Sequence, residues 1–150
     1  MLRQYLIGAA ASVCNIAIHA LVMVAVIKVT RIADELATTH QTLRLIAVMI
    51  AAVTVLMIVH LAEVLVWSLT YAIFGVAPEG SDIVYFAFVN YATLGYGDVT
   101  PVVRWHLLGP MTAMNGVLLF GWSTAVIFEV LRMTLQAGDE GDQPKRGWRK

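Results

Sequence analysis

The stretch that decides the fold is IVYFAFVNYATLGYGD, residues 83–98, in which a hydrophobic run meets a glycine-rich end. Ser81 can cap a helix and Asp82 suits the positive end of one, so we predict a helix over residues 82–92. At 1.5 Å per residue this helix is roughly 16 Å long, about half the hydrocarbon thickness of a bilayer. Extended at about 3.3 Å each, residues 93–97 return roughly the same distance. The two lengths together predict a re-entrant loop that enters a membrane and turns back.

The composition of the whole chain also predicts a membrane protein. Of its 150 residues, 59% are hydrophobic and 13% are charged, whereas a soluble domain has about 45–50% and about 25%. The hydrophobicity excludes a disordered chain, and the single cysteine excludes a disulfide scaffold. The formal net charge is zero, so we expect no nucleic-acid partner.

Three runs are long and apolar enough to span a bilayer as helices: residues 5–27, 45–77 and 107–128. The first run is longer than the usual hydrophobic part of a signal peptide and no small-x-small cleavage site follows it, so we predict a retained helix. Lipid offers the backbone of residues 93–97 no hydrogen-bond partner. That backbone is therefore expected to face a water-filled path.

The basic residues predict how the chain crosses the membrane. Eight of the ten lie between the first two runs or after the third: Lys28, Arg31, Arg44, Arg132, Lys145, Arg146, Arg149 and Lys150. The positive-inside rule then places the N-terminus outside and the C-terminus in the cytoplasm of a multi-pass protein of the plasma or inner membrane. Glu79, Asp82 and Asp98 give the external segment an acidic face, against a lone Arg104.

The sequence TLGYGD, residues 93–98, resembles the selectivity-filter signature of the pore-loop potassium channels, with Leu94 where valine or isoleucine is commoner. The match lies between two spanning runs, follows a helix of half-membrane length and falls on the predicted external side. The resemblance implies an all-α membrane fold whose homotetramer surrounds one potassium pore. K⁺ would be the only bound cofactor, held by carbonyl oxygens. Those carbonyls belong to Thr93, Leu94, Gly95 and Tyr96, with the Thr93 hydroxyl, while Gly97 and Asp98 complete the filter.

Two expectations about the filter follow from its mechanism. Successive carbonyls point the same way only if the backbone alternates in handedness, so Gly95 and Gly97 are expected in left-handed conformations. Leu94 and Tyr96 are expected to point away from the pore and pack against the pore helix.

The expected layout of the chain has four parts. Residues 1–29 form an additional N-terminal transmembrane helix, residues 30–43 a cytoplasmic loop, residues 44–135 the pore domain and residues 136–150 a flexible tail. Within the pore domain we expect an outer helix (44–75), the pore helix (82–92), the filter (93–98) and an inner helix (106–135).

The resemblance also identifies candidate residues that support the filter: Tyr85, Phe86 and Val89. Glu63 and Asn90 are further candidates, from the polar residues of a spanning run and of the pore helix. The Tyr85 hydroxyl is expected to hold Asp98, as a tryptophan does in relatives. Phe86 offers no donor to Tyr96, and Val89 stands where some bacterial channels carry a glutamate.

Polar side chains within the spanning runs cost free energy in the membrane unless other polar groups bond to them. His60 and Glu63 share one helix face. Two ligands are too few for a metal site, so we favour a structural bond behind the filter from Glu63 to Asn90, with pH sensing as the less favoured alternative. Asn15 and His19 are expected to form interhelical hydrogen bonds. Residues 67–71 read as an aromatic belt at the membrane interface.

The inner helix carries the candidate gate. Gly116 and Gly121 can serve as hinges, although close packing against the pore helix is slightly favoured. Val117, Phe120, Thr124 and Phe128 are expected to line the cavity and inner gate. Ser123 and Thr124 can instead bond back to their own helix.

The sequence thus predicts a potassium-selective channel that conducts passively and is not an enzyme, because it shows no nucleophile–base pair or metal-ligand set. Two alternatives remain open. One is a weakly selective cation channel, and the other is a non-conducting regulatory or assembly subunit.

Overall fold

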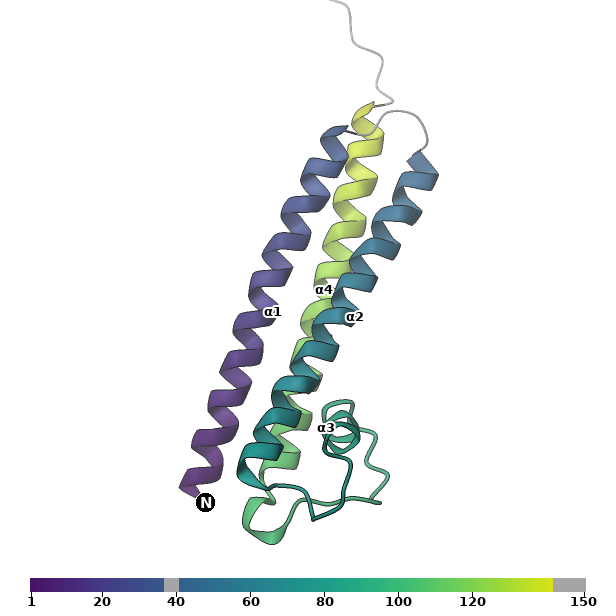
Figure 1. Cartoon of the computed structure of the whole chain (residues 1–150). Helices are drawn as coiled ribbons and strands as arrows, with labels where there is room; N and C mark the ends of the chain where they lie inside the picture. The colour runs from purple at the N-terminus through teal and green to yellow at the C-terminus, as the bar shows by residue number, and fades with distance from the viewer. Residues whose placement is uncertain (37–40, 142–150) are drawn as a thin grey trace, which may run out of the picture.

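A computed structural model describes residues 1–36 and 41–141, and the described residues form helices and loops without a strand. The elements in chain order are α1 (Leu2–Leu36), α2 (Gln41–Phe74), α3 (Ile83–Tyr91), the 3₁₀ turn η1 (Val103–Trp105) and α4 (Leu108–Gly141). Helices α1, α2 and α4 run side by side, and α3 with its flanking loops lies at the end of the bundle where α1 begins (Figure 1).

The three long helices confirm the three predicted spans. The stretches long and apolar enough to cross a membrane are Leu2–Thr30, Thr42–Phe74 and Val103–Gln136, the last of which begins in η1 and continues through most of α4. The ends of the helices differ from prediction, because α1 and α4 continue past the apolar runs to Leu36 and Gly141. The predicted loop is therefore wrong over residues 30–36 and 41–43, and the predicted flexible tail is wrong over 136–141. Polar residues such as Glu35 and Gln136 are good helix formers, so a helix need not end where hydropathy falls.

Helix α3 confirms the predicted short helix to within one residue at each end. Its N-cap is Asp82, whose side chain accepts a hydrogen bond from the Tyr85 backbone N–H at 3.0 Å. Ser81 therefore does not cap the helix, because Asp82 already satisfies one of its free N–H groups. At the other end, the Leu94 N–H donates to the Val89 carbonyl, and the chain then leaves the helix.

The end of the bundle next to α3 has an aromatic core. Trp67 and Tyr71 of α2 are fully buried, and the Tyr71 ring packs against Phe86 of α3. Trp67 Nε1 donates to Asn115 Oδ1 at 3.0 Å, and the Tyr71 hydroxyl lies 2.7 Å from Thr112 Oγ1. The predicted interfacial belt is therefore wrong, because α3 and α4 cover the face of α2 that carries these rings.

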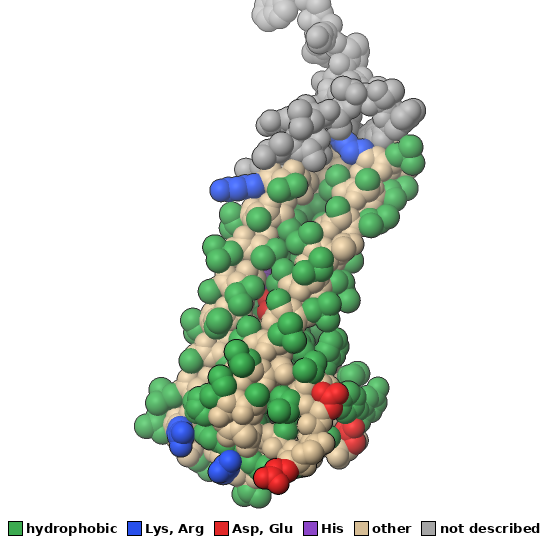
Figure 2. All heavy atoms as spheres, in the orientation of Figure 1, with side chains coloured by type: hydrophobic (Ala, Val, Ile, Leu, Met, Phe, Trp, Pro, Cys, Tyr) green, Lys and Arg blue, Asp and Glu red, His purple; other side chains and the backbone are tan. Residues whose placement is uncertain are grey.

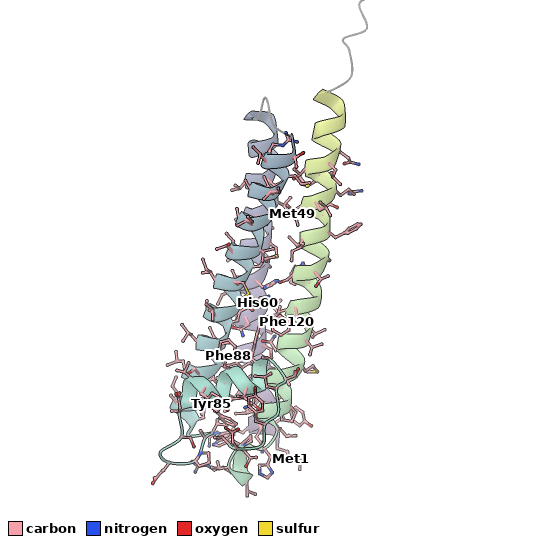
Figure 3. The ribbon with its side chains drawn as sticks, turned by 90° about the vertical axis from the view of Figure 1, so that its right-hand side faces the viewer. Met1, Met49, His60, Tyr85, Phe88 and Phe120 are labelled. Atoms are coloured by element: carbon pink, nitrogen blue, oxygen red, sulfur yellow. The ribbon has the colours of Figure 1, made fainter. Side chains whose placement is uncertain are left out.

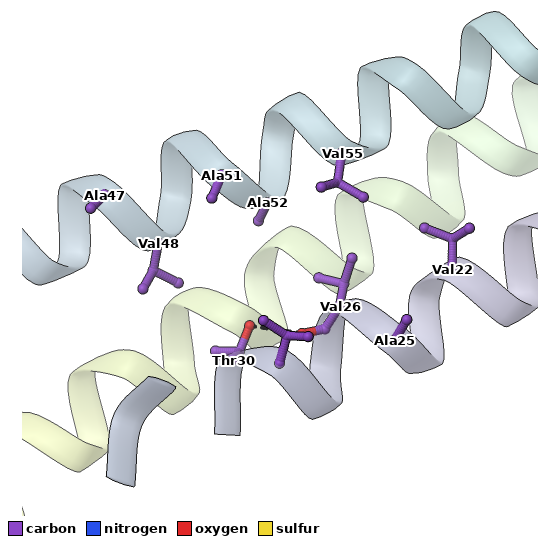
Figure 4. A pocket seen from close by; sticks show the side chains of 10 residues that line it. Val22, Ala25, Val26, Thr30, Ala47, Val48, Ala51, Ala52 and Val55 are labelled. Carbon is purple, nitrogen blue, oxygen red and sulfur yellow. Dashed lines mark hydrogen bonds between the residues drawn. The ribbon is translucent and has the colours of Figure 1, made fainter. Parts of the chain in front are cut away.

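The other end of the bundle is built from small side chains. Between α1 and α2 they leave an apolar cavity of about 420 Å³ (Figure 4). Its lining residues are Val22, Ala25, Val26, Val29, Thr30, Ala47, Val48, Ala51, Ala52 and Val55. The two helices are thus packed less tightly here than at the aromatic end.

Helix α4 passes very close to the C-terminal end of α3 at Gly116. A Cβ atom at this position would lie 2.1 Å from the Tyr91 carbonyl oxygen, whereas one at Gly121 would meet nothing within 4 Å. Close packing against α3 is therefore confirmed for Gly116. Gly121 has no such contact within the chain.

We predict that Gly116→Ala lowers the stability of the folded chain by about 1–3 kcal/mol, because the added methyl group forces α4 away from α3. Gly121→Ala is the matched control and is expected to leave stability unchanged or raise it by up to about 1 kcal/mol. The midpoint of thermal unfolding in one detergent compares them. Equal midpoints for the two variants would contradict the close approach.

Candidate functional site

Residues 93–98 leave the end of α3 as an irregular loop (Figure 3). Gly95 and Gly97 have φ angles of 60° and 78°, which confirms the left-handed backbone expected at both glycines. Thr93 also has a positive φ, 58°, and no other described non-glycine residue does. Left-handed backbone costs a residue with a Cβ, and such conformations concentrate at functional sites. Every second residue from 93 to 97 is therefore left-handed.

The side chains of this segment are uncovered in the single chain. Leu94 is 51% exposed and Tyr96 is 67% exposed. The expectation that both pack against a pore helix stays a prediction, because their exposure is that of a single chain. The described chain therefore leaves about half or more of the surface of each of these side chains uncovered.

Tyr85 ties the start of α3 to the end of the segment. Its hydroxyl donates to Asp98 Oδ2 at 2.8 Å, which confirms the predicted bond. The hydrogen bond to the Asp98 carboxylate raises the pKa of the Tyr85 hydroxyl above its usual value. Asp98 is thereby fixed relative to α3, thirteen residues along the chain from its partner.

The other candidate supports lie behind the segment. Phe86 and Val89 are buried in the contact of α3 with the bundle. The Asn90 side chain donates to the Phe86 carbonyl at 2.9 Å, within its own helix. The predicted bond from Glu63 to Asn90 is therefore wrong, because the Asn90 amide caps a carbonyl of α3 and Tyr91 occupies the place facing Glu63.

Glu63 is fully buried and has three partners from three helices. Its Oε1 lies 2.8 Å from His19 Nδ1 of α1, and its Oε2 lies 2.9 Å from His60 Nδ1 of α2. The Tyr91 hydroxyl, at the end of α3, donates to Oε2. Glu63 thus lies next to the short helix, as predicted, and its bond joins the last residue of that helix to α1 and α2.

Further hydrogen bonds extend this cluster to α4. His60 Nε2 lies 2.9 Å from Ser123 Oγ, so Ser123 bonds across to α2 and not back to its own helix. Asn15 Nδ2 lies 3.2 Å from the Glu63 carbonyl and 3.1 Å from Asn115 Oδ1. The interhelical role predicted for Asn15 and His19 is confirmed. Asn115 was not singled out from the sequence, and Ser123 was expected to bond within its own helix, because a single polar residue carries no signal of the helix it will face.

The candidate cavity residues share one face of α4. Val117, Phe120 and Phe128 are 56%, 38% and 68% exposed, and Thr124 is exposed as well. Thr124 Oγ1 bonds back to the Phe120 carbonyl at 3.0 Å, as expected. Figure 3 shows Phe120 beside His60, and their ring centroids are 4.7 Å apart. Apart from this contact of Phe120 with α2, the side chains on this face of α4 are largely exposed in the single chain.

Charged side chains mark the two ends of the bundle. Figure 2 shows acidic side chains gathered over the loops beside α3, with basic side chains at both ends. Glu79, Asp82 and Asp98 are all exposed, as is Arg104. The end that carries residues 93–98 therefore presents an acidic face.

Comparison with known proteins gives one match. A family model described as "Ion channel" matches residues 59–133, half of the chain. The matched region includes the Glu63 cluster residues of α2, all of α3, residues 93–98 and most of α4. No curated protein and no solved structure matches the chain.

We predict that Asp98→Asn lowers the pKa of Tyr85 toward the ordinary value, because the carboxylate stabilises the neutral hydroxyl and repels its anion. Carbon NMR of ring-labelled tyrosine, with the signal assigned through Tyr85→Phe, measures this pKa. Glu79→Gln removes a nearby exposed carboxylate that makes no bond to Tyr85, and is expected to leave the pKa in place. A Tyr85 pKa that Asp98→Asn does not move would exclude the bond in solution.

Proposed function

The chain belongs to the ion channel family, and from that premise we propose that it forms a potassium-selective channel with residues 93–98 as the selectivity filter. The observation that carries the proposal is the alternating backbone, left-handed at Thr93, Gly95 and Gly97. Alternation of this kind turns successive carbonyl oxygens to one side. The carbonyls of Thr93, Leu94, Gly95 and Tyr96, with the Thr93 hydroxyl, would replace the water around a dehydrated K⁺ ion.

The position of α3 supports a cation at the inner end of the filter. The carbonyl end of a helix carries a partial negative charge, and α3 ends at Tyr91 with Ala92 as its C-cap. Because Thr93 follows directly, this negative end lies next to the first filter residue. A cation waiting below the filter would be stabilised there, which favours conduction of positive ions.

A ring of carbonyls requires several chains, and we propose a homotetramer with the filter on its axis. One chain supplies one strand and leaves Leu94 and Tyr96 uncovered. In the tetramer a neighbouring chain would cover these side chains. The exposed face of α4 would line the cavity of the pore through Val117, Phe120, Thr124 and Phe128. Gly121 is the remaining hinge candidate, since Gly116 packs against α3.

The proposed orientation places the filter end outside the cell membrane. Lys28 lies toward the end of α1, and Arg44 lies at the start of α2, both at the end of the bundle far from α3 (Figure 1). The positive-inside rule favours that end as cytoplasmic. Asp98 and Glu79 then form an acidic external mouth that concentrates cations by its charge.

A weakly selective cation channel is the second candidate function. One observation favours it: the phenyl ring of Phe86 in α3 offers no hydrogen-bond donor to the Tyr96 hydroxyl. A filter whose tyrosine is not fixed from behind can adjust its width to a smaller ion. The permeability ratio of K⁺ to Na⁺ separates the two candidates.

We predict that the purified protein carries K⁺ into liposomes and that Gly95→Ala reduces this flux at least about tenfold, because alanine resists the left-handed conformation there. Gly80→Ala is the matched control: its glycine also has a positive φ, 80°, and open space for a Cβ, but it lies outside the filter. It is expected to conduct as the unchanged protein does. Equal flux through both variants would contradict the assignment of the filter.

We further predict that the purified protein is a tetramer. Native mass spectrometry from detergent is expected to give four times the 16.4 kDa mass of one chain, with bound detergent removed. If protein that conducts K⁺ in liposomes contains no species larger than a dimer by mass spectrometry, a filter built from four chains would be contradicted.

A further inference from the structure

The buried cluster around Glu63 contains three side chains that can bind a metal ion. His19 comes from α1, and His60 and Glu63 come from one face of α2. One ligand atom from each can be chosen so that all lie within 4.8 Å of one another. Only two of the three were apparent as neighbours in the sequence, since His19 lies 44 residues before Glu63.

The two imidazole rings approach the carboxylate in the same way. His19 Nδ1 lies 2.8 Å from Oε1, and His60 Nδ1 lies 2.9 Å from Oε2. In a tetrahedral zinc site with bonds of about 2.0–2.1 Å, neighbouring ligand atoms are roughly 3.3 Å apart. The two His–carboxylate pairs are therefore a few tenths of an ångström shorter than in such a site, and the chosen ligand atoms all lie within 4.8 Å of one another. Binding an ion would require the three side chains to shift until all three atoms reach the zinc-site spacing.

The far side of both rings meets one hydroxyl group. Ser123 Oγ lies 2.9 Å from His60 Nε2 and 3.4 Å from His19 Nε2. A metal-bound histidine generally donates its other ring N–H to a fixed acceptor, which sets the tautomer and the ring orientation. A serine oxygen has two lone pairs, one for each ring. The contacts that would orient two metal-bound histidines are thus already in place.

The tautomers of the two histidines determine whether the cluster can accept a cation. In a mixed arrangement His60 donates to Ser123 and accepts from the Tyr91 hydroxyl, 2.9 Å from its Nδ1, and no cation is needed. The two symmetric arrangements differ. If both rings donate Nε2–H to Ser123, both Nδ1 lone pairs face a carboxylate, which is itself an acceptor. If both rings donate Nδ1–H to Glu63, one serine hydrogen must serve two Nε2 acceptors, and the carboxylate charge stays buried without a countercharge. An ion at the centre resolves the first arrangement by accepting electron pairs from all three groups.

We propose that His19, His60 and Glu63 bind a divalent transition-metal ion of the zinc class, with Ser123 orienting both histidines. Imidazole nitrogen and carboxylate oxygen are ligands that such ions share. An additional proton is the competing occupant. It would sit on one ring, which would then donate to both Glu63 and Ser123, so the contacts suit either occupant and metal binding itself decides between them.

The proposed ion would join the additional helix to the region next to the filter. It would connect α1 to α2 through His19, His60 and Glu63. Glu63 also accepts a hydrogen bond from the hydroxyl of Tyr91, two residues before Thr93. His60 is 12% exposed and the other two ligands are 0% exposed, so His60 marks the side from which an ion would enter.

The test uses the full chain in detergent, stripped of metal with a chelator, in a Cys14→Ser background that removes the exposed thiol. Co²⁺ is the probe, because its visible absorption reports a four-coordinate site. We expect one Co²⁺ per chain and bleaching of the absorption by Zn²⁺. His19→Gln and Glu63→Gln are expected to weaken binding at least about tenfold. His106→Gln, which removes an exposed histidine outside the cluster, is expected to bind as before.

His19→Cys keeps a ligand at position 19 and tests the site even if the glutamine variants fold poorly. A thiolate-to-cobalt charge-transfer band is expected in this variant alone, because only residue 19 has gained sulfur. Any of three results would overturn the proposal. The first is no visible Co²⁺ absorption with the unchanged ligand set, which is the result expected of a cluster that holds a proton. The others are a His19→Gln variant that binds Co²⁺ as tightly as His106→Gln, and a His19→Cys variant that lacks the charge-transfer band. None of these readouts depends on ion conduction.

Discussion

The burial of the Glu63 carboxylate is the constraint on which the rest of the structure depends. An ionisable group within a membrane-spanning helix is costly unless other groups face it. Glu63 meets this requirement with His19 of α1, His60 of α2 and Tyr91 of α3. The additional N-terminal helix is therefore part of the folded unit: without α1, Glu63 would lose one of its three side-chain partners, and its backbone carbonyl would lose the bond from Asn15.

The same cluster determines where α3 ends. Tyr91 bonds to Glu63 on the α2 side, and its carbonyl oxygen lies against Gly116 on the α4 side. The last turn of α3 is thus held between two long helices. The segment that follows is held again at its other end, where the Asp98 carboxylate accepts a hydrogen bond from the Tyr85 hydroxyl. Between these two points, the backbone of residues 93–97 is positioned by both ends of one short helix, which suits the proposed filter.

Local features of this chain were predictable from its sequence. Span lengths and the half-length helix follow from the spacing of residues near one another, and the structure has both. The left-handed glycines, which the structure also has, were expected from the filter mechanism that the resemblance to potassium channels implies. The Tyr85–Asp98 bond was reached through the resemblance to potassium channels. Features that depend on how helices face one another were not predictable. Trp67 and Tyr71 read as interfacial from sequence but are buried, and Glu63 pairs with His19 through a contact that no local spacing encodes.

The central claim, that residues 93–98 select potassium, is tested most directly by the reversal potential of the purified protein in planar bilayers. K⁺ is placed on one side and Na⁺ on the other at equal concentration. A carbonyl-lined filter that replaces the hydration shell of K⁺ predicts a reversal potential displaced far from zero, in the direction that opposes K⁺ efflux. A reversal potential at zero would show that the two ions permeate equally and would contradict selection by this segment.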